Sequence, residues 1–396
     1  MSLVEVFFCL LAFAPFLVLF KPLSNFFYVT FVNILLILIL PRAADGFNFG
    51  LETRTKIVLF LSLVIAWNTL SRKITSLERS ISLFCQFLFI LGLTTSKWTI
   101  LILAILGLSA SSIAILAAGS VNNWRLLIKY SLLSSVFFVS LVGCILWEGE
   151  IMYTQESNKL SPIPQAVLVI AFLGKLANPL INLFNLPLYQ AVSKPSSLSF
   201  AFVLVKIAIF LYFSDILEYL NSQALKVSSF LNFIAAVLSF GLLSYTGSFR
   251  FFIAASSYLT FSSLLFFLSC DPQSNILLFL MIYSFGSIIV LQCLSERLDR
   301  ETNQTGVAGI TLLILGGLAP FFAITFLKLN FIVKTVSVET SFIVGLLFLA
   351  SSFFYGKWAA ILFRQNSERI PRDLASLFFV LALISLILIA APVSFF

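Results

Sequence analysis

Apolar runs recur along this chain from its first residues to its last, and no segment between them is longer than a loop. An α-helix needs about 20 mostly apolar residues to cross the hydrocarbon core of a bilayer, and these runs are long enough. The chain is 60% hydrophobic and 10% charged, which fits no water-soluble class. The sequence therefore predicts an all-α polytopic membrane protein with a single membrane domain over residues 1–396.

Reading the apolar runs against the polar breaks predicts about 14 transmembrane helices. They lie near residues 3–20, 26–41, 56–70, 80–96, 98–118, 127–147, 165–190, 198–217, 228–247, 250–269, 274–294, 305–334, 339–363 and 374–393. Alternate loops then share one face of the membrane, and one set holds twice as many Lys and Arg residues as the other. The positive-inside rule assigns the richer, odd-numbered loops to the matrix or cytoplasm and both termini to the opposite face.

The remaining composition argues against several kinds of site. The net charge of +8 comes from Lys and Arg spread singly through short loops, which predicts no nucleic-acid partner. Histidine is absent, and the five cysteines are scattered through apolar segments without paired spacing. We therefore expect no zinc, haem or iron–sulfur site in the chain.

Three lysines fall inside apolar runs: Lys175, Lys206 and Lys328. A charged side chain near the bilayer centre costs roughly 2.5 to 3.5 kcal/mol on insertion scales, so such residues usually face a protein interior and have a function there. The competing interpretation is a lysine whose ammonium group snorkels to the interface. Lys129, at the start of the predicted helix 127–147, fits an interfacial position at least as well as a proton-path role.

The predicted helices at 165–190 and 305–334 are longer than a simple span and each contains helix-breaking residues. These are Pro179 and Pro187 in the first helix, and Gly316, Gly317 and Pro320 in the second. Paired broken helices at corresponding places in two halves of a membrane protein point to an ion path. The alternative is two unrelated kinked helices.

The pairing predicts an internal repeat. Residues 80–217 and 228–363 would form two five-helix units of inverted topology, with the broken helix fourth in each. Three helices within 1–79 precede the repeats, and the helix at 374–393 follows them.

Three motifs resemble those of the antiporter-like membrane subunits of respiratory NADH dehydrogenase, complex I. The first is GKLANP at 174–179, followed by PLYQ at 187–190. The second is VKIA at 205–208, and the third is GGLAP at 316–320, followed by FLK at 326–328. Their order and spacing match the lysine motifs of helices 7, 8 and 12 in that family.

The resemblance implies a proton-translocating membrane-arm subunit of NADH:ubiquinone oxidoreductase. Lys175 would hold and relay a proton, Lys206 would connect the half-channels, and Lys328 would exchange with the exit path. The chain itself would bind no cofactor, because NADH, FMN, iron–sulfur clusters and ubiquinone would belong to other subunits. Its partners would be the other membrane-arm subunits and the lipid bilayer.

The implied location is the mitochondrial inner membrane, with both termini on the intermembrane-space side. Codon bias in an AT-rich organelle genome would produce the count of 46 Phe. Within the family, a lysine at 328 favours the subunit 2 group over the subunit 4 group, which has glutamate there.

Two departures from the family affect the first half-channel. The family has a glutamate in helix 5 as the charge partner of the helix 7 lysine, whereas Gly107 takes that place here. The family's helix 7 histidine is also missing, with Asn178 or Asn182 the nearest polar residue. Two alternatives therefore stay open: a free-standing secondary cation/proton antiporter, and a structural membrane subunit with a degenerate proton path.

Overall fold

The computed structural model is almost wholly helical in the residues that it describes. These are residues 3–17, 22–40, 43–44, 47–70, 74–95, 97–118, 124–148, 161–176, 192, 194–217, 220–245, 249–270, 276–295, 305–316, 324, 328 and 339–364. They divide into two compact units. Described residues up to Ser228 form the first unit, and those from Ser229 onward form the second.

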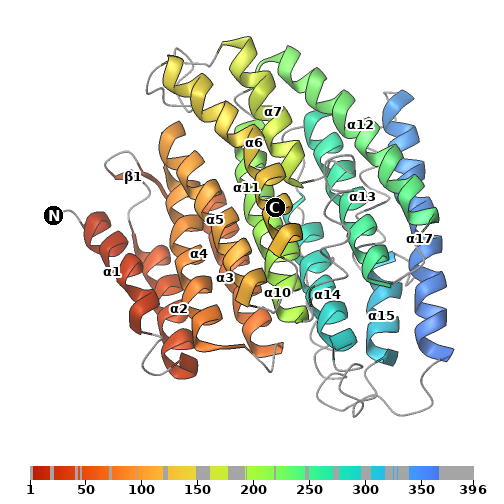
Figure 1. Ribbon diagram of the computed structural model, residues 1–396. Helices are drawn as coiled ribbons and strands as arrows, with labels where there is room; N and C mark the ends of the chain where they lie inside the picture. Colours follow the sequence, from red (N-terminus) through yellow and green to blue (C-terminus); the bar gives the residue numbers. More distant parts are fainter. Residues whose placement is uncertain are drawn as a thin grey trace. The chain divides into compact units, whose positions relative to one another are not determined.

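The first unit is a bundle of helices with one short hairpin (Figure 1). Its helices are α1 (Leu3–Leu17), α2 (Pro22–Ile39), α3 (Leu51–Leu70), α4 (Ser76–Thr94), α5 (Trp98–Ala118), α6 (Trp124–Glu148), α7 (Pro162–Leu176), α10 (Pro195–Ser199), the π-helix η3 (Phe200–Leu204) and α11 (Val205–Leu217). Strands β1 (Ala43–Ala44) and β2 (Phe47–Asn48) pair antiparallel between α2 and α3. Helices α1 to α5 lie side by side, and α4 packs against each of its neighbours.

The second unit contains the green to blue helices of Figure 1. They are α12 (Ser222–Ser244, most of which lies in this unit), α13 (Phe249–Cys270), α14 (Leu277–Ser295), α15 (Thr305–Gly316) and α17 (Glu339–Arg364). Helix α15 packs between α14 and α17, and α17 also contacts α13. Aromatic pairs such as Phe252 with Tyr355 join α13 to α17.

The observed helix bounds lie within a few residues of the predicted ones, and the predicted helix 98–118 coincides with α5. Helices α3, α4 and α12 begin earlier than predicted, at Leu51, Ser76 and Ser222 instead of 56, 80 and 228. The predicted helix 374–393 lies outside the described residues, as do the second half of the helix at 165–190 and, apart from residues 324 and 328, that of the helix at 305–334. The total of 14 helices, the inverted repeats and the two helix breaks therefore stay predictions.

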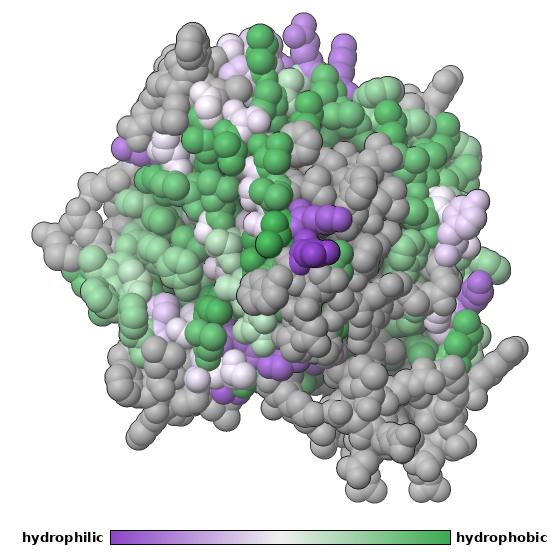
Figure 2. Space-filling model, viewed as in Figure 1, coloured by the Kyte–Doolittle hydropathy of each residue, from purple (hydrophilic) through white to green (hydrophobic). Residues whose placement is uncertain are grey.

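Six of the described helices are long and apolar enough to cross a membrane. Two of them, Pro195–Leu217 and Phe251–Cys270, are almost entirely buried inside the protein. The outer helices instead expose large apolar side chains, for example Phe13, Phe230 and Phe353. Figure 2 shows apolar residues over much of the described surface on one face of the molecule. This distribution of an apolar exterior around buried helices is the one expected in lipid.

Helices α4 and α5 approach each other closely at two glycines. A Cβ atom at Gly107 would lie 2.6 Å from Cδ1 of Leu88, and one at Gly92 would lie 2.9 Å from the Cβ of Ala104. Real Cβ atoms essentially never come this close, so Gly107 is the residue that allows this helix contact. A larger residue at position 107 would need the Leu88 side chain to move.

Candidate functional site

A continuous helical segment of three elements, α10, η3 and α11, carries Lys206 through the middle of the first unit. The π-helical turn at Phe200–Leu204 ends two residues before Lys206. In it, the backbone N–H of Val205 donates to the carbonyl of Phe200, five residues earlier. Wide turns of this kind are rare within α-helices and frequently occur at functional sites.

Lys206 is buried, with only 5% of its surface exposed. Its ammonium nitrogen lies 6.0 Å from the centre of the Phe202 ring. Helix α11 packs against α3, α4, α5 and α7, and the rings of Phe172 and Phe213 stack at 4.7 Å across the α7 contact. Lys206 therefore lies on a helix that is surrounded by other helices of the first unit, and its side chain is buried there.

Lys175 lies in the last turn of α7 and is half-buried. Its ammonium group donates a hydrogen bond of 2.8 Å to the hydroxyl of Ser109 on α5. Ser109 is itself buried and lies two residues after Gly107, so the two positions are on different sides of α5. A hydrogen bond from an ammonium group to a hydroxyl group thus joins α7 to α5.

Lys328 is buried in the second unit, with 2% of its surface exposed. Its ammonium group donates to the carbonyl of Gly316 at 3.0 Å, and the hydroxyl of Ser352 donates to the same oxygen. Gly316 is the last residue of α15, where carbonyl groups lack partners within the helix and carry partial negative charge. The rings of Phe348 and Tyr355 on α17 lie 4.7 and 5.6 Å from the ammonium nitrogen. The cation is therefore held by a helix end and two aromatic faces.

Buried hydroxyl groups continue from Lys328 into α13 and α14. The Tyr355 hydroxyl is hydrogen-bonded to Ser256 and Thr260 of α13. Thr260 is also bonded to the hydroxyl of Tyr283 on α14, which bonds in addition to Ser257 and Ser287. Hydroxyl groups both donate and accept, so a connected set of them can pass protons along. We define these residues, Ser256, Ser257, Thr260, Tyr283, Ser287 and Tyr355, as the hydroxyl network.

A further buried cation, Lys56, joins α3 to α11 near the end of α11. Its ammonium group pairs with the carboxylates of Asp215 on α11 and of Glu52 on α3, the latter at 2.6 Å. The Lys56 side chain is 4% exposed, whereas those of Asp215 and Glu52 are 24% and 64% exposed. The helix predicted at 56–70 begins at Lys56, whereas Lys56 lies inside α3 and pairs with Asp215 on the helix of Lys206.

Lys56→Met is expected to destabilise the first unit, because it leaves the Asp215 carboxylate without its cation. Breaking a buried ion pair from one side costs about 3 to 5 kcal/mol, and the partial exposure of Asp215 reduces this to about 2 to 3 kcal/mol. Glu52→Gln is the matched control, with an expected loss of about 1 kcal/mol or less because the Glu52 carboxylate is exposed. Thermal unfolding of the purified variants measures both, and equal melting temperatures for the two variants would contradict this account.

The other predicted site residues are placed as follows. Lys175 and Lys206 belong to the first unit, on helices α7 and α11 that contact each other. Lys129 is exposed on α6, which agrees with the interfacial interpretation. Gly316 contributes its carbonyl to the Lys328 site. The remaining helix-break residues, Pro179, Pro187, Gly317 and Pro320, lie outside the described residues.

Two polar residues of the first unit, Ser109 and Glu78, were not predicted from the sequence. The helix predicted at 80–96 leaves Glu78 outside it. The spacing of Thr75 and Glu78 is that of a capping box, which would have started the helix at Ser76. Ser109 carries no comparable signal, because serine within an apolar helix usually bonds only to its own backbone.

Known structures of similar fold were found, whereas no family model matches the sequence and no curated protein matches it. A chain of respiratory complex I from Thermus thermophilus has a TM-score of 0.78 at 14% identity, covering 97% of this chain and 96% of its own. A chain of the Mrp complex from Dietzia sp. has a TM-score of 0.73 at 12% identity, covering 94% and 81%. A chain of the membrane-bound sulfane sulfur reductase, an archaeal respiratory membrane complex, has a TM-score of 0.76 at 13% identity, covering 96% and 93%.

The chain therefore has the fold of membrane subunits found in respiratory and Mrp complexes. These matches extend over nearly the whole chain. The sequence identity is low enough that the similarity establishes the fold alone.

Proposed function

We propose that this chain is a proton-translocating membrane-arm subunit of a respiratory NADH:quinone oxidoreductase. The observation that carries the proposal is the burial of Lys206 and Lys328, each within the interior of its own helical unit. Placing amines at this depth is unfavourable, and membrane proteins retain such residues chiefly where ions or protons pass. The fold shared with complex I and the sulfane sulfur reductase supports the same assignment.

In this function each lysine takes up and releases a proton in turn. Lys175 exchanges with the Ser109 hydroxyl, and Lys328 exchanges with the hydroxyl network through water beside Tyr355. Lys206 receives and passes on protons between the two half-channels. The energy comes from conformational and electrostatic coupling to other subunits. This chain binds none of NADH, FMN, iron–sulfur clusters or ubiquinone, and it performs no electron transfer.

The particular subunit that we propose is subunit 2 of the mitochondrial enzyme. Lysine at position 328 supports it, because glutamate is expected there in the subunit 4 group. In this assignment the chain crosses the mitochondrial inner membrane about 14 times, as two inverted five-helix repeats with breaks in the helices of Lys175 and Lys328. Both termini face the intermembrane space, as the Lys and Arg distribution among the loops suggests.

A cation/proton antiporter is the second candidate, because the fold is also that of a chain in the Mrp complex. Both functions need protonatable groups within the membrane, so the lysines do not separate them. The two functions differ in the complex to which the chain would belong. They also differ in the energy source, which is NADH oxidation for the first and exchange with another cation for the second.

Isolation of the tagged chain in mild detergent tests the proposed function. We expect the chain to migrate within a large assembly that oxidises NADH, and the reconstituted assembly to acidify vesicles during NADH oxidation. Sodium/proton exchange without NADH, in an assembly that lacks NADH oxidation, would favour the antiporter instead. An NADH-oxidising assembly whose proton yield does not depend on the three lysines would leave this chain a structural role.

A further inference from the structure

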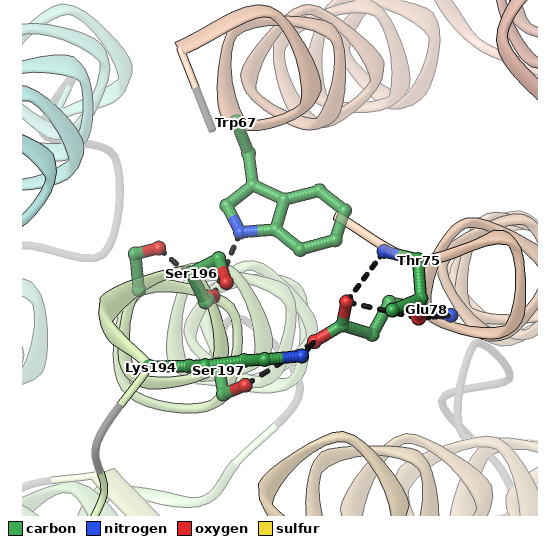
Figure 3. Close-up of polar contacts among 7 residues, drawn as sticks. Trp67, Thr75, Glu78, Lys194, Ser196 and Ser197 are labelled. Atoms are coloured by element: carbon green, nitrogen blue, oxygen red, sulfur yellow. Dashed lines mark hydrogen bonds and ion pairs between the residues drawn. The ribbon is translucent and has the colours of Figure 1, made fainter. Parts of the chain in front are cut away.

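A fully buried carboxylate, Glu78, lies beside the start of the helical segment that carries Lys206. Glu78 belongs to the first turn of α4 and is 0% exposed. Ser197 lies in the first turn of α10, which continues through η3 into α11. Figure 3 shows the Glu78 side chain directed from α4 towards Lys194 and Ser197. A buried acidic side chain in a membrane protein calls for a functional explanation.

The two oxygens of the Glu78 carboxylate have different surroundings. Oε2 accepts from the backbone N–H of Thr75 at 2.7 Å and from its hydroxyl at 3.0 Å, which completes a capping box for α4. Oε1 faces the other helix, where the Ser197 hydroxyl donates to it at 3.4 Å and the Lys194 ammonium lies at 3.8 Å. Capping therefore accounts for Oε2 alone.

The contacts of Oε1 are longer than ordinary hydrogen bonds, which measure about 2.7 to 3.2 Å. A carboxylate oxygen can accept more than one hydrogen bond, so Oε1 retains the capacity to take up a proton. The Lys194 side chain is 32% exposed, and it leads from Oε1 towards solvent. On the other side, Ser197 belongs to the helix of Lys206 and lies nine residues before it, about 13 Å along the helix axis.

The surrounding contacts hold this arrangement in place. The indole N–H of Trp67 on α3 donates to the carbonyl of Ser196 at 2.9 Å, which ties the start of α10 to the first unit (Figure 3). The neighbouring cation Arg79 donates to Asn68 at 3.1 Å and also interacts electrostatically with Glu78. Lys194 is thus the cation within 4 Å of Oε1 among the residues described at this corner.

We propose that Glu78 is a proton-loading carboxylate, which takes protons from the Lys194 side and passes them through Ser197 towards Lys206. This inference rests on the proposed function. A proton from water at Lys194 binds Oε1 and gives the neutral carboxylic acid. The acid then transfers its proton to the Ser197 oxygen while the Ser197 proton leaves to water inside the bundle. The step ends with Glu78 ionised again and one more proton on the way to Lys206. By the Lys and Arg distribution, this corner faces the matrix or cytoplasm.

Glu78→Gln tests the proposal, because glutamine supports a capping box but holds no exchangeable acid proton. A positioned proton-transfer group contributes on the order of 10² to 10⁴-fold, so we expect NADH-driven proton uptake by the reconstituted complex to fall at least about tenfold. The melting temperature should stay unchanged. Glu52→Gln, which changes an exposed carboxylate in the same unit, is the control and should pump normally. Normal pumping by Glu78→Gln would overturn the proposal and leave Glu78 as a helix cap.

Ser197→Ala provides a second test that does not depend on the folding of the glutamate variant. It removes the hydroxyl facing Oε1 and should lower proton uptake severalfold, while Ser199→Ala in the same turn should have no effect. Equal rates for both serine variants would also overturn the proposal. Lys206→Met separates this inference from the proposed function: if that variant stops pumping while the Glu78 and Ser197 variants pump normally, only the role of Glu78 is wrong. If Lys206→Met also pumps normally, the proposed function fails.

Discussion

Replacing Lys206 with methionine is expected to stop NADH-driven proton translocation through this subunit while the complex remains folded and assembled. Methionine is similar in length and flexibility to lysine and suits the apolar surroundings of α11. The substitution also removes an unfavourable buried amine, so it should not destabilise the first unit. Because a positioned proton-transfer group contributes on the order of 10² to 10⁴-fold, the rate of proton uptake should fall at least about tenfold.

Two further variants define why Lys206 matters. Lys206→Arg keeps a positive charge but cannot be deprotonated in a protein, so it should also fail if proton exchange is the role of this residue. Lys226→Met changes an exposed lysine on α12 and should pump normally. Normal pumping by Lys206→Arg alone would show that only the charge is needed, and normal pumping by Lys206→Met would contradict the proton-path role altogether.

Lys328→Met should have a comparable effect in the second unit. The variant removes the cation from the Gly316 carbonyl and separates the hydroxyl network from its protonatable neighbour. Ser352 still donates to that carbonyl, so the end of α15 keeps one partner and the helix packing should persist. We expect proton uptake to fall at least about tenfold. The exposed Lys357 on the same helix, α17, supplies the matched control Lys357→Met.

Tyr355→Phe tests the route that leads away from Lys328. It keeps the aromatic face beside the ammonium group and removes only the hydroxyl that bonds to Ser256 and Thr260. If protons leave through the hydroxyl network, pumping should fall severalfold in this variant although Lys328 is intact. Loss of pumping in Lys328→Met with normal pumping in Tyr355→Phe would mean that protons leave Lys328 by another route. Normal pumping in both would remove Lys328 from the proton path.

The sequence predicted helices well where charged residues bound an apolar run, as Lys97 does before α5. It failed where charged residues lie inside a helix. Helix α3 begins five residues earlier than predicted, because Lys56 is neutralised by Asp215 and Glu52 and does not end the helix. A hydropathy pattern cannot detect that pairing, since Asp215 lies 159 residues further along the chain.

The candidate site was also predictable only in part. The lysines stand out in the sequence because few residue types are as unfavourable in an apolar run. Their partners do not stand out. Ser109 and Tyr355 resemble any serine or tyrosine of a membrane helix until the fold brings them to Lys175 and Lys328. The glycine at position 107 was visible in the sequence, but its close contact with Leu88 depends on how α4 and α5 pack.

The most direct test of the central claim is a density map of the native assembly at a resolution that shows ordered water. We predict water molecules within hydrogen-bonding distance of the ammonium groups of Lys175, Lys206 and Lys328, in cavities lined by protein. Amines that extend to lipid headgroups, or that sit in a dry and wholly apolar interior, would contradict proton translocation by this chain.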